Sequence, residues 1–470
     1  MNTKQKVVTK IESLAFEGKG VARVDGKVVF VRYAVPNDIV EIELLRNKKN
    51  FAEGKITRIV EPSPFRIEPI CKHFGVCGGC SFQNIPYEVQ LEWKRRFVVD
   101  AFEKIGKISN VEIKSVLPSP KIFGYRNKME FSFGTSRWLT DEEIETQTEI
   151  STKEKQFALG FHIPERFDKV LNINYCHLQD ERGNTIVNSI RNKAFELDIP
   201  AYNLRNHIGF LRNLILRFSF TTNELLLNLV TTSQVGEKEK KYLDWFKENF
   251  TSSELVDQLL VTTNDSYSPT AFGTIEILKG NGYLFENIGE VRFRISPFAF
   301  FQVNTLQANN LVSKVIEYAN AKEKIVWDMY SGAGTFSLPL AKVAKTVIGL
   351  ESLESAVEDA KFNAQLNGIE NAYFIAKDLH TKNILQELSK FPNPEVMIID
   401  PPRSGIHKNL LNAIITIKPE RIVYVSCNPT TQARDCQEFA KYYDLVEIQP
   451  VDMFPHTYHI ESIALLVKKG

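Results

Sequence analysis

Residues 324–351, KIVWDMYSGAGTFSLPLAKVAKTVIGLE, hold the pattern that decides the fold. An apolar run that contains Asp328 leads into a glycine-containing turn and a helical segment, and a second apolar run ends at Glu351. Apolar strands that alternate with helices are typical of a parallel sheet with helices on both faces. This stretch therefore predicts the start of a doubly wound α/β sheet.

The same alternation continues toward the C-terminus. The segments VMIIDPPRSG (396–405) and RIVYVSCNP (421–429) each begin with an apolar run, end in a polar turn and are followed by a helical segment. A last pair of strands is expected near residues 445–450 and 462–468. Residues 306–470 are therefore predicted to form one α/β domain whose ligands bind at the carboxyl ends of the strands.

The turn after the first strand predicts a cofactor site. Glycines at 332 and 334 let a ligand approach the backbone, and Glu351 ends the next strand 17 residues after Gly334. A carboxylate at that place can accept both ribose hydroxyls of a nucleoside, and Asp378, which ends the third strand, could face the adenine. Because the third glycine of a dinucleotide fingerprint is missing, the pattern favours S-adenosylmethionine over a dinucleotide.

Three further residues mark the same edge of the predicted sheet. Asp400 begins the rigid Asp-Pro-Pro-Arg turn, Cys427 directly follows the fifth strand, and Glu461 directly precedes the last one. A single cysteine is more often a small buried hydrophobe than a nucleophile, but its place at the ligand-binding edge favours a chemical role. Cys436, in the helix that follows, lacks that context and is assigned to packing.

The N-terminal segment has a different texture. Residues 6–60 read as five short alternating strands, which suggests a small barrel of the oligonucleotide-binding kind, and the proline-rich residues 61–69 read as a linker. Residues 1–130 carry 23 Lys and Arg against 15 Asp and Glu, whereas the remainder carries 35 against 42. A balance of +8 fits a phosphate-binding module, although a chance surplus of solvated lysines explains the charge equally well.

The middle of the chain mixes strands and polar loops. Residues 110–300 are predicted to form an α+β substrate domain, in which the polar run 140–155 is an exposed, mobile insertion. Phe298, Phe300 and Phe301 could stack on splayed RNA bases, although three phenylalanines in four residues are as often core. With 470 residues in all, about three domains are expected.

The cysteines of the N-terminal half predict a metal site. Cys71, Cys77 and Cys80 fall within ten residues, and Cys176 is the one cysteine left outside the predicted catalytic sheet. Four cysteines suit either an iron–sulfur cluster or tetrahedral zinc. His73 and His177 keep zinc open as an alternative.

Two classes of protein are excluded by composition. No stretch approaches 18 consecutive apolar residues, so a membrane span is not expected. The N-terminus, MNTKQKVVTK, lacks the apolar core of a secretory signal, so a cytoplasmic protein is expected.

Together, these motifs resemble the RNA uracil-C5 methyltransferases, and most closely the iron–sulfur-containing branch that methylates 23S ribosomal RNA. The resemblance covers nearly the whole chain. It implies a TRAM barrel over residues 1–65, a central RNA-recognition domain over 66–305 and a Rossmann-like methyltransferase domain over 306–470. It also implies that Tyr125-Arg126-Asn127 is a basic motif of the RNA-facing domain.

The resemblance further implies a role for each motif residue. Cys427 matches the nucleophile and Glu461 the general base, which would give 5-methyluridine through addition of the thiolate to C6 of uracil. The remaining matches are the cofactor contacts Gln302, Tyr330, Glu351 and Asp400 and the 4Fe-4S ligands Cys71, Cys77, Cys80 and Cys176. Because the nucleophile must ionise, its surroundings are expected to favour the thiolate.

Two alternatives stay open. The chain could methylate transfer RNA, although the transfer-RNA relatives typically lack both the barrel and the cluster. It could also be a catalytically silent RNA-binding iron–sulfur protein, against which the pairing of Cys427 with Glu461 argues. The expected partner is RNA, and the expected state is a monomer.

Overall fold

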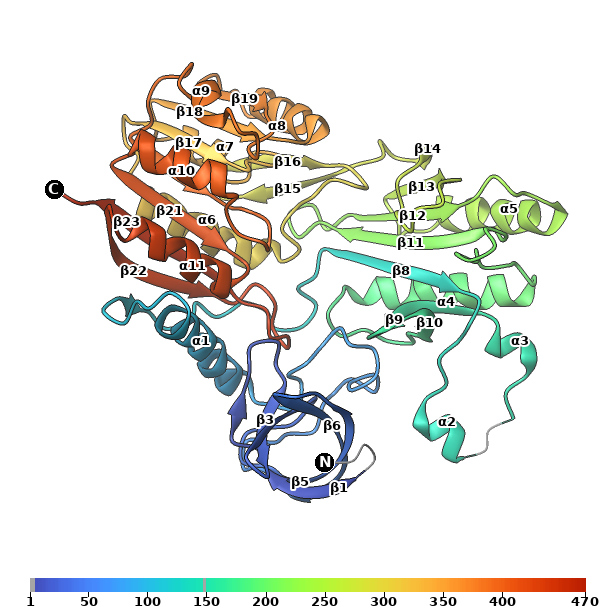
Figure 1. The fold of residues 1–470 in the computed structure, drawn as a ribbon. Helices are drawn as coiled ribbons and strands as arrows, with labels where there is room; N and C mark the ends of the chain where they lie inside the picture. The colour runs from blue at the N-terminus through green and yellow to red at the C-terminus, as the bar shows by residue number, and fades with distance from the viewer. Residues whose placement is uncertain (1–4, 147–148) are drawn as a thin grey trace. The chain divides into compact units, whose positions relative to one another are not determined.

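The computed structural model describes residues 5–146 and 149–470, and the chain forms two compact units (Figure 1). The first unit comprises residues 1–75, 79–120 and 309–470, and the second comprises 76–78 and 121–308. None of the described helices combines the length and the apolar character that a membrane crossing requires.

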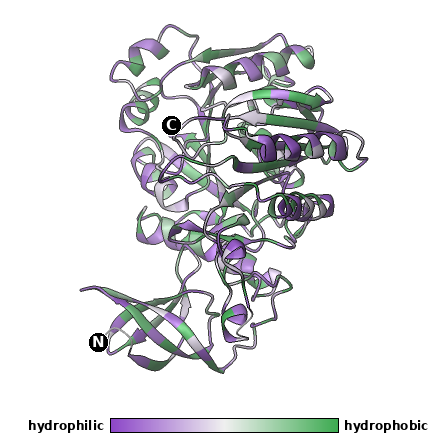
Figure 2. Ribbon diagram, turned by 90° about the vertical axis from the view of Figure 1, so that its right-hand side faces the viewer, coloured by the Kyte–Doolittle hydropathy of each residue, from purple (hydrophilic) through white to green (hydrophobic). Residues whose placement is uncertain are grey.

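The N-terminal residues of the first unit form the predicted barrel. Its strands follow the order β1-β5-β6-β4-β3-β2, with buried residues such as Val29, Val40 and Ile42 alternating with polar ones (Figure 2). The structure has one strand more than the five predicted, because the first predicted strand breaks at Ile11 and Glu12 into β1 and β2. The strands are β1 (Lys6–Lys10), β2 (Ser13–Leu14), β3 (Gly20–Val24), β4 (Lys27–Val31), β5 (Ile39–Asn47) and β6 (Phe51–Glu61).

The C-terminal residues of the same unit form an eight-stranded sheet with the order β19-β18-β17-β20-β21-β23-β22-β7. The five strands from β17 to β21 are mutually parallel, whereas β23 is antiparallel to both β21 and β22. This confirms the predicted doubly wound sheet. The strands are β17 (Ile325–Met329), β18 (Thr346–Glu351), β19 (Ala372–Ala376), β20 (Val396–Ile399), β21 (Arg421–Ser426), β22 (Tyr443–Val451), β23 (Glu461–Lys468) and β7 (Glu112–Ile113).

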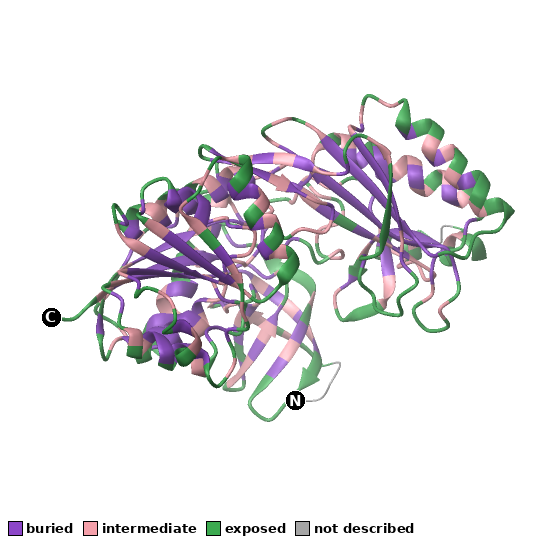
Figure 3. Ribbon diagram, turned by 90° about the horizontal axis from the view of Figure 1, so that it is seen from above, coloured by how far each residue is buried: buried purple, intermediate pink, exposed green. Residues whose placement is uncertain are grey.

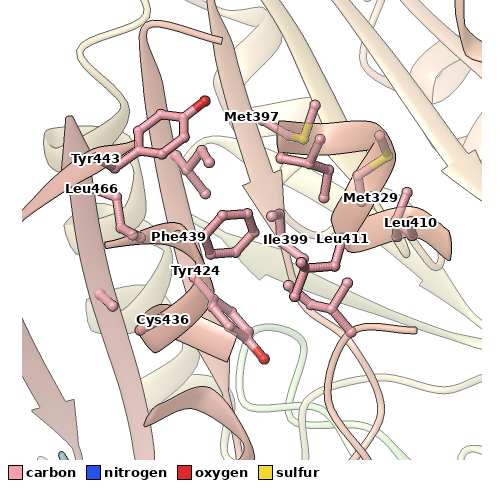
Figure 4. Packing of buried hydrophobic residues seen from close by; sticks show 14 of the residues in the cluster. Met329, Met397, Ile399, Leu410, Leu411, Tyr424, Cys436, Phe439, Tyr443 and Leu466 are labelled. Carbon is pink, nitrogen blue, oxygen red and sulfur yellow. The ribbon is translucent and has the colours of Figure 1, made fainter. Parts of the chain in front are cut away.

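Helices from both ends of the sequence cover this sheet. Met397 and Tyr424 pack against α10 (Lys408–Ile417) and α11 (Pro429–Phe439), and Cys436 lies fully buried in the same cluster (Figure 4). The assignment of Cys436 to packing is therefore confirmed. Helix α1 (Tyr87–Lys104) lies against α11, and β7 adds an edge strand beside β22. The remaining helices of this region are α6 (Thr305–Ala319), α7 (Ser337–Ala341), α8 (Glu354–Leu366) and α9 (Ile384–Leu388).

The second unit contains a seven-stranded sheet with the order β10-β9-β8-β11-β12-β13-β14 and a separate hairpin, β15-β16. Helices α4 (Glu181–Glu196) and α5 (Glu237–Thr251) bury one face of the sheet against residues such as Phe131 and Leu214, and its central strands are buried (Figure 3). The strands are β8 (Lys128–Gly134), β9 (Ala158–Ile163), β10 (Arg166–Asn172), β11 (Leu211–Phe218), β12 (Leu225–Thr231), β13 (Gln258–Thr263), β14 (Thr274–Lys279), β15 (Leu284–Ile288) and β16 (Val291–Ile295).

The predicted insertion at 140–155 forms two short exposed helices. Helices α2 (Asp141–Glu145) and α3 (Thr152–Lys155) each begin with a capping box and bury no residue. Residues 147–148, which also belong to the insertion, lie outside the described residues.

A buried ion pair joins α1 to the loop that precedes β23. The Lys94 ammonium lies 2.5 Å from the Asp452 carboxylate, both side chains are fully buried, and Lys94 also donates to the carbonyl of Phe454 at 2.9 Å. Asp452 accepts a second hydrogen bond from the hydroxyl of Tyr87 at 2.9 Å. Because isolated charges are costly to bury, this pair fixes the position of residues 452–454 on α1.

We expect Lys94→Ala to lower the free energy of unfolding by about 3–5 kcal/mol, because the variant leaves the Asp452 carboxylate buried without its counter-ion. Urea denaturation of the purified protein measures this loss. The matched double variant Lys94→Met/Asp452→Leu removes both charges and should recover part of the stability. A Lys94→Ala variant as stable as the wild type would contradict the assignment.

Candidate active site

Polar residues follow the five parallel strands at one edge of the eight-stranded sheet. Because the carboxyl ends of parallel strands meet at that edge, the crevice around β17, where the strand order reverses, is the expected ligand site. The structure brings together there the five predicted residues Tyr330, Glu351, Asp378, Asp400 and Cys427.

The glycine loop after β17 closes on the end of β18. The backbone N–H of Gly332 donates to Oε2 of Glu351 at 3.1 Å, and the N–H of Leu353 donates to Oε1 at 2.9 Å. Gly334 has φ +89°, and a Cβ there would approach Leu338 to 3.0 Å, so the turn needs glycine. The loop and the carboxylate that the cofactor prediction requires are therefore adjacent.

Tyr330 and two histidines form one lip of this crevice. The hydroxyl of Tyr330 lies 3.5 Å from Nε2 of His380, and the ring of His380 stacks on that of His407 with centroids 4.9 Å apart. The N–H of His380 donates to Asp378 at 2.9 Å, which orients that carboxylate. Nothing in the sequence signals the histidine pair, because its members are 27 residues apart and meet only through the fold.

Strand pairing brings Cys427 and Glu461 to the same place. Antiparallel β21 and β23 pair Ser426 with Ser462. Cys427, which directly follows β21, and Glu461, the first residue of β23, therefore stand opposite each other. The side-chain amide of Gln432 donates to the carbonyl of Ser462 at 3.0 Å and thereby holds α11 against β23. Glu461 is 6% exposed, and Cys427 is half-buried.

Arg403 is the cation of this site. Its guanidinium lowers the pKa of the Cys427 thiol by its charge and lies 3.1 Å from Nδ1 of His459. The turn that carries Arg403 is fixed by buried Asp435, which accepts the N–H of Ile406 at 2.9 Å. The sequence places Arg403 only at the end of the Asp-Pro-Pro-Arg turn and does not show its effect on the cysteine.

Three carboxyl groups in this region have raised pKa values. Burial, reinforced by the charge of Asp400, raises the pKa of Glu461 to about 8. Burial and the neighbouring charge of Asp328 raise the pKa of Asp400 to about 7. Asp328, which the sequence analysis did not assign to the site, also has a pKa of about 7 through burial, although Ser337 donates to its Oδ2 at 2.5 Å. These groups are therefore largely or partly protonated near neutral pH.

The surroundings of Cys427 do not favour the thiolate, contrary to the sequence-based expectation. Burial, followed by the charges of Glu461 and Asp400, raises the pKa of the thiol to about 11, and Arg403 opposes this only in part. The expectation was wrong because the sequence shows neither the burial of the sulfur nor the carboxylates that face it.

The other predicted contacts belong to the second unit. Gln302 is half-buried, and its carbonyl accepts a hydrogen bond from the side chain of Asn127 at 2.8 Å. Phe301 is buried against Phe293, whereas Phe300 is 77% exposed and has an accessible ring. Tyr125 is fully buried, so in the predicted basic motif it is the half-buried Arg126 that keeps solvent contact.

The four cysteines predicted as metal ligands are divided between the units. Cys71 and Cys80 lie in the first unit, and Cys77 and Cys176 lie in the second. Across residues 5–146 and 149–470, no group of three or more His, Cys, Asp or Glu side chains that could hold a metal ion is found. The predicted cluster is therefore not shown by the structure.

The geometry of the first unit is that of an α/β protein with a ligand crevice at the carboxyl ends of its parallel strands and, at the same edge, a half-buried cysteine and a buried glutamate. Residues 284–469 match the family model described as tRNA (Uracil-5-)-methyltransferase, and residues 5–57 match the TRAM domain. An uncharacterized RNA methyltransferase of Bacteroides thetaiotaomicron is 40% identical over 96% of this chain and 99% of its own, and one of Caldanaerobacter subterraneus is 40% identical over 98% of each.

A solved structure is similar over the same extent. The Pyrococcus abyssi tRNA (uracil-54, C5)-methyltransferase in complex with S-adenosyl-L-homocysteine has a TM-score of 0.75, with 32% identity over 98% of this chain and 99% of its own. The chain belongs to the uracil-C5 RNA methyltransferase family, a family that uses S-adenosylmethionine. The resemblance found in the sequence is thereby confirmed.

The raised pKa predicts how Cys427 reacts in the free enzyme. Iodoacetamide should modify Cys427 slowly at pH 7, with a rate that rises about tenfold per pH unit up to pH 9, because only the thiolate reacts. Asp400→Asn should speed the reaction several-fold at pH 8, because the wild-type Asp400 carboxylate raises the pKa of the thiol. Arg403→Ala should slow it, because the wild-type Arg403 guanidinium lowers that pKa. Mass spectrometry of the Cys427 peptide measures the rate, with buried Cys436 as the internal reference. A rate that levels off near pH 7 would refute the raised pKa.

Proposed function

We propose that this protein methylates C5 of a uridine in 23S ribosomal RNA and that Cys427 and Glu461 perform the covalent chemistry. The observation that carries the proposal is the pairing of β21 with β23, which sets these two residues opposite each other at the edge of the sheet where the glycine loop also lies. A nucleophile and a base at one end of a cofactor crevice are what methylation of an unreactive ring carbon requires. The proposed setting is a cytoplasmic monomer bound to RNA.

Cys427 activates the ring. Carbon C5 of uracil is a weak nucleophile, and addition of the Cys427 thiolate to C6 makes the ring an enolate with electron density at C5. Because the pKa of this thiol is raised in the free protein, ionisation has to accompany substrate binding. Arg403, whose charge lowers the pKa of this thiol, is the group that would stabilise the thiolate as it forms.

Glu461 completes the reaction. After C5 has gained its methyl group, the carboxylate of Glu461 takes the proton from C5, the C6–S bond breaks, and 5-methyluracil and the thiolate of Cys427 remain. A pKa of about 8 makes this carboxylate a stronger base than an ordinary glutamate, and it lies near the working pH, where a general base is most effective.

The remaining predicted residues would hold the cofactor, which supplies a methyl group on a sulfonium. Glu351 and the glycine loop fit the ribose, and Asp378 and Tyr330 line the same crevice. Asp400 would orient the cofactor or the base, because its charge opposes ionisation of Cys427. Gln302 is proposed as a further cofactor contact on the strength of the family motif, and Phe300 is the phenylalanine of that motif with a ring free to stack on RNA.

The choice of ribosomal over transfer RNA rests on the cysteine signature. The TRAM barrel does not discriminate, because the Pyrococcus abyssi transfer-RNA enzyme is similar over 98% of this chain. Transfer RNA is therefore the second candidate substrate, favoured by that similarity. We propose the same domain roles for either RNA. Residues 1–65 and 66–305 recognise the RNA, and residues 306–470 methylate it.

Ribosomal RNA that contains 5-fluorouridine should form an adduct with the wild-type protein that survives denaturation. Fluorine replaces the C5 proton that the base must remove, so the thiol cannot be eliminated from C6. Denaturing gel electrophoresis with labelled 23S fragments detects the adduct. The Cys427→Ala variant should form none, and an adduct of undiminished yield would remove Cys427 from its role. Transfer RNA treated in the same way is the matched substrate control, and faster reaction there would move the proposal to transfer RNA.

The Glu461→Gln variant should accumulate the covalent complex on unfluorinated RNA and turn over at least a hundredfold more slowly, because the C5 proton has no acceptor. Rapid release of methylated RNA by this variant would remove Glu461 from the role of base. A wild-type protein that binds RNA but methylates none would support the catalytically silent alternative.

We further propose that Cys71, Cys77, Cys80 and Cys176 bind a 4Fe-4S cluster, with zinc as the alternative. The donor set fits, since four thiols suit either metal. The amide of Gln83 donates to the sulfur of Cys80 at 3.2 Å, a contact that would stabilise a thiolate. Uracil methylation requires no electron transfer, so no step of the proposed reaction passes through the cluster.

Anaerobically purified protein should contain about four irons per chain and show a broad visible absorbance. Elemental analysis measures both metals, and the Cys71→Ser variant should lose them. One zinc per chain in a colourless protein would replace the cluster by the alternative, and metal-free protein that still binds RNA would rule out both.

A further inference from the structure

The second unit holds a cavity with no part in the chemistry proposed above. Its volume is about 210 Å³, and it lies at the end of the seven-stranded sheet where β8 ends and β11 begins. Antiparallel pairing places Ser132 of β8 opposite Asn213 of β11, and both residues line the cavity. Because Phe131 and Phe133 belong to the core under α4 and α5, the alternating side chain of Ser132 points to the other face of the sheet.

The floor of this cavity carries a polar group that lacks a protein partner. Asn213 is 9% exposed, and its side-chain amide forms no hydrogen bond within the described parts of the chain. The hydroxyl of Ser132 beside it has no such partner there either. Because the Asn213 amide and the Ser132 hydroxyl line the cavity and make no hydrogen bond to the described protein groups, both can donate to and accept from a ligand there.

The rim adds positive charge and an exposed ring. Arg205 and His162 are exposed, and neither side chain has an ion pair or hydrogen bond within the described residues. Phe167 is 70% exposed at the same rim. The lining contains one carboxylate, Asp168, whose charge is matched by Arg166 at 3.1 Å. The rim therefore offers net positive charge.

Tyr202 and Arg212 build a rigid wall. The guanidinium of Arg212 donates to the carbonyls of Asn264 and Ser266 at 2.8 and 2.6 Å and lies over the ring of Tyr202 at 4.4 Å. These contacts hold Arg212 in place and fix the loop of residues 264–268 beside it. The cavity is thus a built site rather than a gap between mobile loops.

We propose that this cavity binds one unpaired nucleotide of the RNA substrate. A free aromatic ring for stacking, an amide and a hydroxyl for a base edge, and the guanidinium of Arg205 for phosphate are the elements with which proteins recognise single-stranded RNA. The proposal rests on the proposed RNA substrate and assigns part of its recognition to the end of β8 and β11. A free mononucleotide has the same chemical groups, so the experiment must distinguish binding of RNA from binding of a free mononucleotide.

The test measures binding of 23S fragments by fluorescence anisotropy in the full-length protein. Phe167→Ala and Arg205→Ala should each weaken RNA binding about tenfold, because a stacked base and a phosphate contact are lost. Phe167→Tyr, which keeps a ring, should restore the affinity, and Tyr442→Ala, an exposed aromatic outside the cavity, should leave it unchanged. Both sites of change are exposed, so the variants should fold.

A second readout separates this inference from the methylation proposal. In the methylation assay, Phe167→Ala should raise the KM for RNA about tenfold and leave kcat and S-adenosylmethionine binding unchanged. If the wild type methylates no RNA, the anisotropy measurement still tests the cavity. RNA affinities equal to wild type in both alanine variants would overturn the proposal. Binding of uridine 5′-monophosphate that Phe167→Ala abolishes, with RNA affinity unchanged, would overturn it in favour of a free nucleotide.

Discussion

The antiparallel pairing of β21 with β23 is the constraint on which the proposed chemistry depends. It sets Ser426 opposite Ser462, and so puts Cys427 and Glu461 at one edge of the sheet although they are 34 residues apart. A register slip of one residue would turn the glutamate to the other face of the sheet. The hydrogen bonds of Gln432 to the strands on both sides therefore protect the catalytic geometry as well as the fold.

The second constraint on the site is the raised pKa of its acidic groups. Asp328, Asp400 and Glu461 have pKa values of about 7, 7 and 8, while that of Cys427 is about 11. Ionised carboxylates oppose a nearby thiolate, so the same protons that keep these groups neutral also reduce the repulsion that Cys427 must overcome. Arg403 opposes this repulsion, because its charge favours the thiolate form of Cys427.

The sequence predicted the parts of this structure that depend on local pattern. Apolar runs located the strands, and because each run ends at a defined residue, Glu351, Asp400 and Cys427 could be assigned to one edge, whereas Tyr330 came from the family resemblance. The sequence did not predict the effect of Arg403 on Cys427 or the buried charge of Asp328, because both depend on distances set by tertiary packing. The pKa of Cys427 was predicted in the wrong direction for the same reason, and the stack of His380 on His407 left no local signal.

The catalytic sheet also depends on residues far from it in sequence. The loop before Glu461 is held by Lys94 through Asp452, and the carbonyl of His456 accepts the N–H groups of Ser81 and Phe82 at 2.8 and 3.0 Å. These residues directly follow Cys80, so the cysteine segment is hydrogen-bonded to the loop that precedes Glu461. A chain that began at residue 306 would lack Lys94, the counter-ion of Asp452, so residues 80–94 are part of what holds the loop before Glu461 in place.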